Sequence, residues 1–370
     1  MPMPRASVYL ILLILGCLLV ACGPRPVQTG SQPAPNQPGG ASASPRVDVK
    51  AVEDFYRGKT VRLLVGFSAG GGYDTVARLL ARHLPSHIPG NPNVIVENMP
   101  GASGLIAANY LFHQAPKDGT VIEVFSEPGL RDELVNAEGA QFKAREFTWL
   151  GSTQIQTNLC FARTDSGIGS FRDLVGGSQQ LIVGTTGPGS NLHDFPAVLR
   201  VALNANIRLV PGYPGSSDVT LAAESGEVNG ACIPWESLRV TRPQWFSGTP
   251  PFATILVQQG SEKHADLPNV PLAEELAQTN EQRQLIRAAT STLAISKPLI
   301  APPGIPADRA AVLRQAFEAM MKDPELLRDA ENAKIELSVK SWDQVVAIVD
   351  DILKTPPAVA DQLKHILEPA

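Results

Sequence analysis

The sequence predicts an α/β protein of two lobes with a ligand cleft between them. Segments that read strand, glycine-rich loop and helix recur in two separate parts of the chain, residues 59–126 and 181–233. The part that can fold, about 320 residues, is longer than a single hydrophobic core usually supports. Strands that alternate with helices are typical of parallel sheets with right-handed crossovers. We therefore expect residues 51–155 with 283–370 to form one lobe, and residues 156–282 to form the other.

The first 22 residues are expected to be an export signal. Arg5 precedes residues 8–21, an uncharged apolar run that is shorter than the roughly 20 residues of a membrane-spanning helix. The run ends in Leu-Val-Ala followed by Cys22, a pattern at which lipoproteins are cleaved and acylated. An ordinary signal peptide with a chance cysteine is the alternative. We expect a lipid on Cys22, with two acyl chains holding the protein in the periplasm or at the outer face of a membrane.

Residues 23–50 are expected to be a disordered tether. They are rich in Pro, Gly, Ser and Gln and contain almost no large apolar side chains. Such a segment cannot bury enough surface to offset the entropy lost on ordering. It would hold the folded body away from the membrane.

The net charge limits the class of partner that the protein can bind, and the positions of the cysteines leave a disulfide open. The net charge is −5 and no basic run is present, which argues against nucleic acid as a partner. Two of the four cysteines belong to the export segment, so that Cys160 and Cys232 remain in the folded body. An exported protein can form a disulfide, but two buried free thiols are equally compatible with the sequence.

The first lobe is predicted from strands that alternate with helices. Apolar residues spaced by three or four favour a helix over residues 73–87, and runs of β-branched and apolar residues favour the strands. The expected strands are residues 59–67, 93–97 and 120–126, and a second helix is expected to stop at the Ala-Pro of residues 115–116. This order predicts a parallel sheet.

The second lobe repeats the pattern, and a helical stretch follows it. The expected strands are residues 181–184, 207–210 and 228–233, with a helix that begins near Asn191. The later helices are expected over residues 307–321, 324–333 and 342–354. We expect these three helices to pack back on the first lobe.

Three loops indicate an anion site. Residues 68–74, 100–104 and 185–191 each join the end of a strand to the start of a helix through glycines. The first N–H groups of a helix lack intrahelical partners, and the helix dipole places a partial positive charge there. Glycine lets a ligand approach this backbone closely, and such ends bind carboxylate or phosphate. Because ligands bind at the carboxyl ends of the strands in open α/β sheets, we expect the loops to hold an anion from both lobes.

No cofactor or metal is expected. The loops lack the GK[ST] of a phosphate-binding loop and the GxGxxG of a dinucleotide site. His83 and His87 are spaced like metal ligands on one helix, but no third ligand is near them in the sequence.

A serine hydrolase is the enzymatic alternative. Residues 66–70, GFSAG, match the G-x-S-x-G nucleophile elbow, with Ser68 as the nucleophile. In that enzyme fold an earlier loop supplies half of the oxyanion hole. Here the elbow follows the first strand directly after the tether, so no earlier loop exists to supply it. We therefore expect a protein that is not an enzyme.

Several motifs resemble those of the extracytoplasmic receptors of the tripartite tricarboxylate transporter family. The resemblance covers residues 58–357. Residues 67–78, FSAGGGYDTVAR, resemble the family's F-P-P-G-G-x-x-D-x-x-A-R, and residues 97–104, ENMPGASG, resemble its E-N-R-P-G-A-G-G. Further similar segments are APKDG at 115–119, GPGSNLH at 187–193, LPNVP at 267–271 and APPGIP at 301–306. The family's V-P-Y-K-G is replaced by VPGYPG at 210–215, without the lysine, which leaves the substrate open.

The resemblance implies a type II periplasmic-binding-protein fold that closes on a carboxylate. The residues that it and the loop positions suggest for ligand binding are Ser68, Ala69, Gly71, Gly72, Tyr73, Ala102, Ser103 and Ser126 of the first lobe and Thr186, Gly189 and Ser190 of the second. Asp74 and His193 are expected to support their loops rather than to touch the ligand.

The function expected from the residues and the resemblance is transport. A monomeric receptor would capture a mono- or dicarboxylate by closure of the two lobes and deliver it to a membrane permease of the tripartite type. A receptor of the same fold that signals to a membrane kinase is the alternative, and the sequence does not separate the two.

Overall fold

A computed structural model describes residues 48–67, 69–187, 190–213 and 215–367. The expected signal peptide, the expected acylation site Cys22 and nearly all of the expected tether lie outside the described residues. Helix α1 (Val49–Tyr56) includes the last two residues of the expected tether, because Asp48 caps it and Val52 and Tyr56 are buried. Within the described residues, no helix combines the length and the apolar character that crossing a membrane requires.

The first sheet contains six strands in the described part of the chain. They are, in order across the sheet, β11 (Lys340–Ser341), β4 (Thr148–Gln154), β10 (Ser296–Ala301), β3 (Val121–Val124), β1 (Thr60–Val65) and β2 (Asn93–Asn98). The predicted parallel arrangement of β1, β2 and β3 is confirmed, whereas β10 runs antiparallel to β3 and to β4. Val65 is in register with Asn98 and with Val124. The loops that follow these three strands therefore begin at one edge of the sheet.

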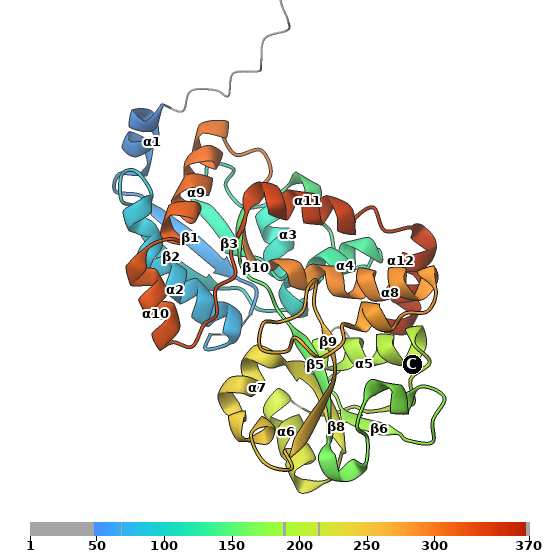
Figure 1. The fold of residues 1–370 in the computed structure, drawn as a ribbon. Helices are drawn as coiled ribbons and strands as arrows, with labels where there is room; N and C mark the ends of the chain where they lie inside the picture. The colour runs from blue at the N-terminus through green and yellow to red at the C-terminus, as the bar shows by residue number, and fades with distance from the viewer. Residues whose placement is uncertain (1–47, 68, 188–189, 214, 368–370) are drawn as a thin grey trace, which may run out of the picture. The chain divides into compact units, whose positions relative to one another are not determined.

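Helices cover both faces of this sheet (Figure 1). One core contains side chains of α2 (Gly72–His87), α9 (Ala307–Met320) and α10 (Pro324–Asn332). The other contains side chains of α3 (Leu105–His113), α4 (Pro128–Leu134) and α11 (Trp342–Ile352). The prediction that the late helices at 307–354 pack on the first lobe is confirmed by α9, α10 and α11.

The second sheet contains five strands in the described part of the chain. They are, in order, β7 (Ile207–Val210), β6 (Leu181–Gly184), β8 (Gly230–Pro234), β5 (Asn158–Arg163) and β9 (Ala253–Gln259). Its helices include α5 (Asn191–Ala202), α6 (Ser216–Ser225) and α7 (Trp235–Thr241). β6 is parallel to β7 and β8, and β5 is antiparallel to β8 and β9. In each sheet, three neighbouring parallel strands thus lie beside antiparallel strands.

The boundary between the lobes differs from the expected one. Helices α8 (Asn280–Thr290) and α12 (Pro357–Leu367) pack on each other and on α5. Their buried side chains, including Leu285 and Leu363, belong to the core of the second sheet. The expected assignment of residues 283–370 to the first lobe therefore does not hold for these two helices. Their apolar faces pack on each other and on α5, and their position in the chain does not predict this packing.

The chain crosses between the sheets twice. It leaves the first sheet at the end of β4, enters the second at β5, and returns from β9 to β10 through residues 260–295. These two connections, and a third from α11 to α12, are the segments about which such lobes can close.

Cys160 and Cys232 form a disulfide, which answers the question that the sequence leaves open. The two residues face each other on the neighbouring strands β5 and β8. Their Cα atoms are 4.0 Å apart and both side chains are buried. The bond joins two central strands of the second sheet.

Candidate functional site

The edge of the first sheet at which β1, β2 and β3 end carries two of the three expected loops. Asn98, at the end of β2, donates from its amide to the Phe67 carbonyl and to Asp74 Oδ1, both at 2.9 Å. The Met99 N–H donates to the Val65 carbonyl at 2.8 Å. The loop after β1 and the loop after β2 are therefore tied to each other. Ser68 lies outside the described residues.

Asp74 supports the first loop from inside α2. Its Oδ2 accepts from the Gly70 N–H and from Arg78 Nε, each at 2.8 Å. These bonds, the one from Arg78 first among them, lower the pKa of Asp74 to about 2. The carboxylate is 2% exposed and its acceptors are used by the protein. This geometry suits a loop brace and leaves the first N–H groups of α2, from Gly72 onward, for another anion.

The second loop has a left-handed backbone over four consecutive residues. The φ angles are 140° at Gly101, 45° at Ala102, 54° at Ser103 and 97° at Gly104. Left-handed non-glycine residues carry strain and occur most often at functional sites. A Cβ on Gly66 would lie 2.5 Å from the Gly104 Cα, so that the two loops touch through their backbones. Ala102 and Ser103 are exposed.

Tyr73 lies in the first turn of α2 and points to the end of β3. Its ring stacks on Phe67 with centroids 4.4 Å apart, and its hydroxyl donates to Glu127 Oε2 at 2.6 Å. Burial, together with the nearby Glu127 carboxylate, raises the pKa of Tyr73 well above its usual value. Glu127 is 2% exposed and also accepts from Ser296 Oγ at 3.1 Å and from the Lys297 N–H at 3.3 Å. This carboxylate therefore joins α2 to β10.

Ser126 lies beneath both loops. It follows β3, is 3% exposed, and would contact a side chain at position 104, since a Cβ there would lie 2.8 Å from its own Cβ. Its Oγ contacts the Tyr73 hydroxyl and makes no hydrogen bond of normal geometry within the described residues. A buried hydroxyl that is so weakly satisfied is uncommon and calls for an explanation.

Lys297 is a residue of this site that the sequence reasoning missed. It belongs to β10, far along the chain, and its Nζ lies 5.4 Å from the centroid of the Tyr73 ring. Its Cε is 4.0 Å from the position that a Cβ on Gly72 would occupy. The anion site was expected to use backbone dipoles without a basic side chain. The structure places an ammonium group beside the first turn of α2.

The third loop connects β6 to α5 in the second lobe. The hydroxyls of Thr186 and Ser190 share a hydrogen bond, and Ser190 Oγ also donates to the Gly187 carbonyl at 2.9 Å. Gly189 lies outside the described residues. The backbone N–H of His193 donates to the Ser190 carbonyl at 3.1 Å, and the His193 Nδ1 lies 3.1 Å from Asp194 Oδ1. The role of His193 as a support of the loop stays a prediction.

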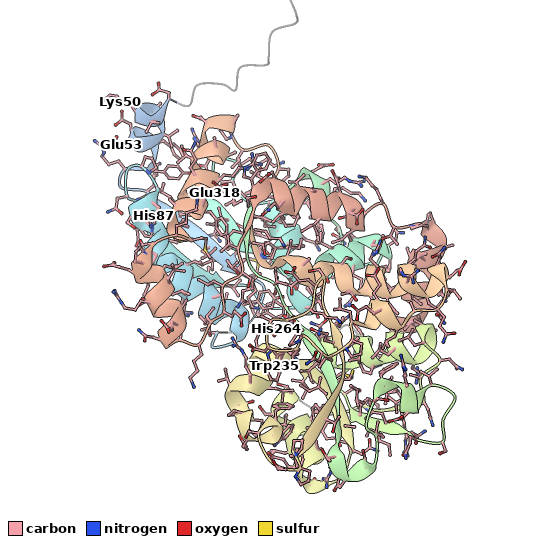
Figure 2. The ribbon with its side chains drawn as sticks, viewed as in Figure 1. Lys50, Glu53, His87, Trp235, His264 and Glu318 are labelled. Atoms are coloured by element: carbon pink, nitrogen blue, oxygen red, sulfur yellow. A yellow bond between two sulfur atoms is a disulfide. The ribbon has the colours of Figure 1, made fainter. Side chains whose placement is uncertain are left out.

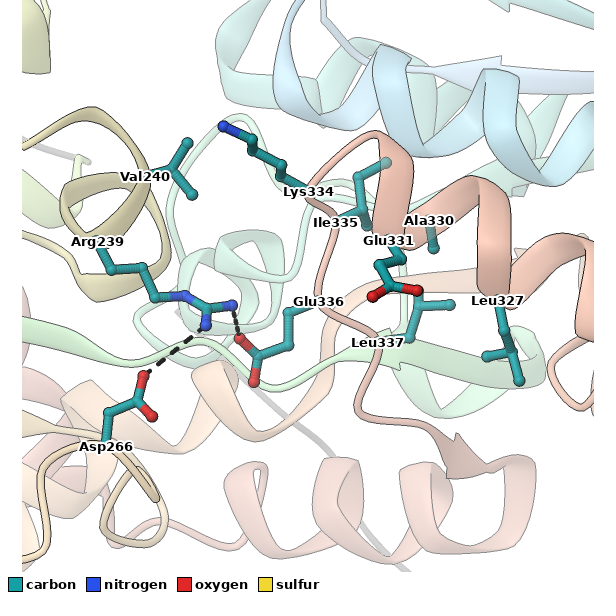
Figure 3. Close-up of a pocket in the computed structure, with 10 residues that line it drawn as sticks. All are labelled: Arg239, Val240, Asp266, Leu327, Ala330, Glu331, Lys334, Ile335, Glu336 and Leu337. Carbon is teal, nitrogen blue, oxygen red and sulfur yellow. Dashed lines mark hydrogen bonds and ion pairs between the residues drawn. The ribbon is translucent and has the colours of Figure 1, made fainter. Parts of the chain in front are cut away.

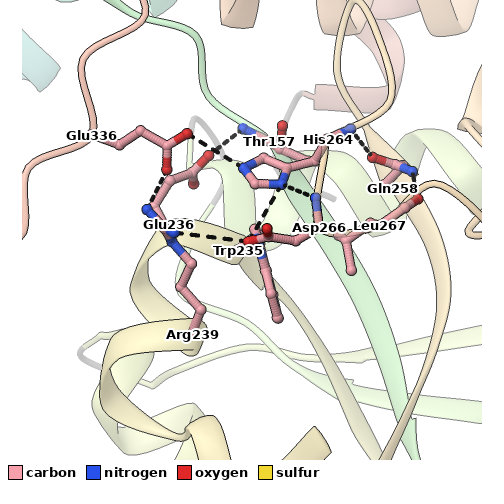
Figure 4. A network of polar contacts seen from close by, with 9 residues as sticks. All are labelled: Thr157, Trp235, Glu236, Arg239, Gln258, His264, Asp266, Leu267 and Glu336. Carbon is pink, nitrogen blue, oxygen red and sulfur yellow. Dashed lines mark hydrogen bonds and ion pairs between the residues drawn. The ribbon is translucent and has the colours of Figure 1, made fainter.

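A polar network joins α7 of the second lobe to residues after α10 in the first (Figure 4). Arg239 pairs with Glu336, and His264 Nε2 lies 3.6 Å from the same carboxylate. The Glu336 carbonyl accepts from Gln154 Nε2 at 2.7 Å. Trp235 donates from Nε1 to Asp266 Oδ2 at 3.0 Å, and Figure 2 shows it next to His264. Gln154 ends β4, so this network lies beside one of the two crossings.

Two pockets lie near these contacts. One, of about 650 Å³, is bounded by Arg239, Asp266 and Glu336 and by α10 (Figure 3). The other, of about 420 Å³, is lined by the first loop and by α2, including Gly70 and Arg78. Only the second contains residues expected to bind the ligand.

His83 and His87 do not form a metal site with each other. His83 Nε2 lies 3.1 Å from Asp329 Oδ2, and His87 Nε2 lies 3.0 Å from Asp323 Oδ2. Both carboxylates belong to α10 or to its N-cap, so the histidines join α2 to α10; Figure 2 shows His87 on α2. Within the described residues, no cluster of potential ligands could hold a metal ion.

Comparison with known proteins identifies the family. Residues 76–364 match the sequence model of the tripartite tricarboxylate transporter family receptors. The chain belongs to this receptor family. Two similar proteins are each 24% identical: a UPF0065 protein of Cupriavidus necator, matched over 85% of this chain and 90% of its own length, and one of a Pseudomonas species, matched over 60% and 65%. The second match spans less than two thirds of that relative.

Solved structures with the same fold include receptors of this kind. A TctC solute-binding protein from Polaromonas, solved without ligand, is 18% identical with a TM-score of 0.64, over 84% of this chain and 99% of the other. MatC from Rhodopseudomonas palustris, solved with malate, is 20% identical with a TM-score of 0.55, over 84% and 99%. A second R. palustris protein, solved with adipate, is 20% identical with a TM-score of 0.56, over 83% and 97%. The predicted two-lobed α/β fold of periplasmic binding proteins is confirmed.

Membership of the tripartite tricarboxylate transporter receptor family answers the question of enzyme or receptor. The family consists of solute-binding receptors of membrane transporters, and the alternative of a serine hydrolase with Ser68 as nucleophile is set aside. The three loops of this receptor lie where strands end, as the sequence predicts.

Proposed function

We propose that this receptor binds a small organic carboxylate between its two lobes, at the first turn of α2 and the first turn of α5, and delivers it to a tripartite-type permease. The observation that carries the proposal is the arrangement around Gly72. Asp74 turns its oxygens to the loop and to Arg78, so the start of α2 keeps its positive potential for a ligand. Ser126 Oγ is a buried donor that makes no hydrogen bond of normal geometry within the described part of the chain.

The residues proposed to bind the ligand are those expected from the sequence. They are Ser68, Ala69, Gly71, Gly72, Tyr73, Ala102, Ser103 and Ser126 on one lobe and Thr186, Gly189 and Ser190 on the other. Malate and adipate, the acids held by the two R. palustris proteins of the same fold, support a carboxylate as the ligand class. A ligand that contacts both lobes favours the closed state by its difference in affinity for the closed and open states.

The proposed location is the periplasm, with a lipid on Cys22 as the anchor. The apolar run before Cys22 and the tether after it support this proposal. Mass spectrometry of the exported protein and of Cys22→Ser tests the anchor alone. An exported wild-type protein without an acylated Cys22 would contradict the anchor and leave ligand binding untouched.

Thermal unfolding and calorimetry of residues 48–370 with a panel of organic acids test the binding function. All four hydrophobic cores lie within these residues. A ligand at 100 times its Kd raises the free energy of unfolding by about 2.7 kcal/mol. Malate, adipate, their monocarboxylate analogues and aromatic acids form the panel, with neutral sugars as the control. The proposal fails if no acid in the panel binds.

A further inference from the structure

Lys297 has the position of a ligand-binding residue. Its side chain runs along the start of α2, with Cε 4.0 Å from the Cβ position of Gly72 and Nζ 5.4 Å from the Tyr73 ring centroid. The Tyr73 ring contacts both Phe67 and the ammonium group. The positive charge of Lys297 and the partial positive charge of the helix terminus therefore act on the same volume.

The ammonium group has no carboxylate partner within 4.0 Å among the described residues. Its hydrogen bond is a long one, 3.5 Å, to Ser296 Oγ. The nearby Glu127 does not neutralise it directly, since its two oxygens accept from Tyr73 Oη, Ser296 Oγ and the Lys297 backbone N–H. Glu127 and Glu236 act on Lys297 from a longer range.

Keeping an unpaired cation here is costly. Burial lowers the pKa of Lys297 below its usual value, which means that its surroundings disfavour the charge. The backbone at Lys297 is left-handed, with φ of 49°, a conformation that costs a non-glycine residue free energy. Ser126 is a second group beside Tyr73 and is buried, with only a weak contact to the Tyr73 hydroxyl. An anion at the start of α2 would give both groups a stronger partner.

We propose that Lys297 Nζ forms a direct ion pair with a carboxylate of the ligand at the start of α2, and that Ser126 Oγ donates to the same carboxylate. The inference rests on the proposed function and adds to it. The first lobe would hold the acid through a full charge and a hydroxyl as well as through backbone N–H groups. Lys297 is then a determinant of affinity for anionic over neutral analogues.

The test compares Lys297→Met with Lys297→Arg by calorimetry, with malate and adipate as the probes. Methionine keeps the length of the side chain and removes the charge. We expect Lys297→Met to raise Kd by about 10- to 100-fold, the effect of losing a hydrogen bond to a charged group, and Lys297→Arg to restore part of the affinity. Without ligand, Lys297→Met should unfold at the same or a higher temperature, because it removes a desolvated charge.

Lys334→Met is the matched control. Lys334 is exposed and also has a left-handed backbone, with φ of 56°. The same replacement in the same conformation should leave Kd unchanged. Adipamide, the neutral analogue of adipate, completes the control, since its binding should not depend on Lys297.

The pH dependence separates an ion pair from a structural role. Acid ligands stay ionised at pH 7 and above, whereas burial lowers the pKa of Lys297, so that this residue loses its proton at a lower pH than an exposed lysine does. Tyr73 faces it with a pKa well above 10, and Glu127 and Glu236 are the acidic groups near it. We expect affinity to fall with rising pH in the wild type and to stay level in Lys297→Met.

The outcomes are distinct. If the wild type binds malate or adipate and Lys297→Met binds it equally well, the ion pair is refuted and the proposed function stands. If the wild type binds no acid, both fail. If Lys297→Met does not fold, the pH dependence of the wild type decides, because an affinity that stays constant from pH 7 through the ordinary range of lysine titration refutes the assignment.

Discussion

Arg131 and Asp194 form an ion pair, with Nη2 and Oδ2 2.8 Å apart, and both side chains are 4% exposed. Arg131 belongs to α4 of the first lobe, and Asp194 belongs to the first turn of α5 in the second. The Asp194 N–H donates to the Ser190 carbonyl at 2.8 Å. The pair therefore links the first lobe to the loop between β6 and α5, which we propose contacts the ligand from the second lobe.

Replacing one member of this pair should destabilise the protein strongly. Arg131→Met leaves a buried carboxylate without its counter-charge, which costs about 3–5 kcal/mol in the free energy of unfolding. Urea unfolding at pH 7 measures the loss, and the double variant Arg131→Met/Asp194→Leu should recover most of it. Arg145→Met is the control: its pair with Asp350 is exposed, at 50% and 42%, and is worth less than about 1 kcal/mol. A loss below that value for Arg131→Met would contradict the prediction.

Glu123 should destabilise the native state increasingly as the pH rises. It lies in β3 between Leu64 and Ile300, is fully buried, and has no partner for either oxygen among the described residues. Burial raises its pKa well above the usual value. Between the unfolded pKa, about 4.3, and this raised pKa the unfolded chain has lost a proton that the native state retains. Stability then falls as pH rises, by up to about 1.4 kcal/mol per pH unit.

Glu123→Met removes this dependence. We expect the variant to be more stable than the wild type at pH 8, with a smaller difference at pH 4.5, as measured by urea unfolding at both values. The exposed Glu138→Met serves as the control. If the difference in the free energy of unfolding between Glu123→Met and the wild type does not grow with pH, then Glu123 is paired or exposed.

The Cys160–Cys232 disulfide should stabilise the second lobe mainly by restricting the unfolded chain. The two residues are 72 apart in sequence, and closing a loop of this length is worth about 4 kcal/mol in the chain-entropy description. Reduction, or Cys160→Ala/Cys232→Ala, should lower the urea midpoint by a corresponding amount and leave ligand affinity nearly unchanged. Reductant should not affect the double-alanine variant. Equal midpoints for oxidised and reduced wild type would exclude the bond.

Asp74 should matter for ligand affinity through the loop that it braces. Asp74→Ala removes the acceptor of the Gly70 N–H and of the Asn98 amide, and we expect about a 5- to 10-fold rise in Kd. Arg78→Met keeps those two bonds and should have a smaller effect. The two variants are compared by calorimetry with one acid that the wild type binds. An unchanged Kd for Asp74→Ala would mean that the loop keeps its shape without the brace.

Asp74 should also contribute to acid stability. Its folded pKa, about 2, is lower than the usual value of 3.8. Its contribution is therefore present above pH 4 and is lost as the pH falls toward 2. Between pH 2 and 5, the free energy of unfolding should depend more steeply on pH in the wild type than in Asp74→Ala. Parallel pH dependences would contradict the assignment.

Local patterns in the sequence predicted most of the first and second α/β units. The boundaries of β6 and β7 match, and α2 begins one residue earlier than expected. Alternation of short apolar runs with glycine loops and amphipathic helices is a local signal, so it can be read without knowing the fold. Strands β4, β5 and β9 lack a glycine loop and helix directly after them, and they were not predicted from the sequence. β10 was not predicted either, although a glycine-containing loop and α9 follow it. Helices α8 and α12 were predicted in the wrong lobe or not at all, because their partners are distant in sequence.

By itself, the sequence determined the class of fold, the three glycine loops at helix starts, and the similarity of these loops to those of the family, since each depends on residues that are neighbours in the chain. Only the tertiary structure decided the disulfide, the Arg131–Asp194 pair and the place of Lys297 beside Tyr73. These relationships join residues that lie between 63 and 224 positions apart by their numbers. The packing of sheets and helices brings these distant residues together, and no local sequence pattern predicts which side chains will meet.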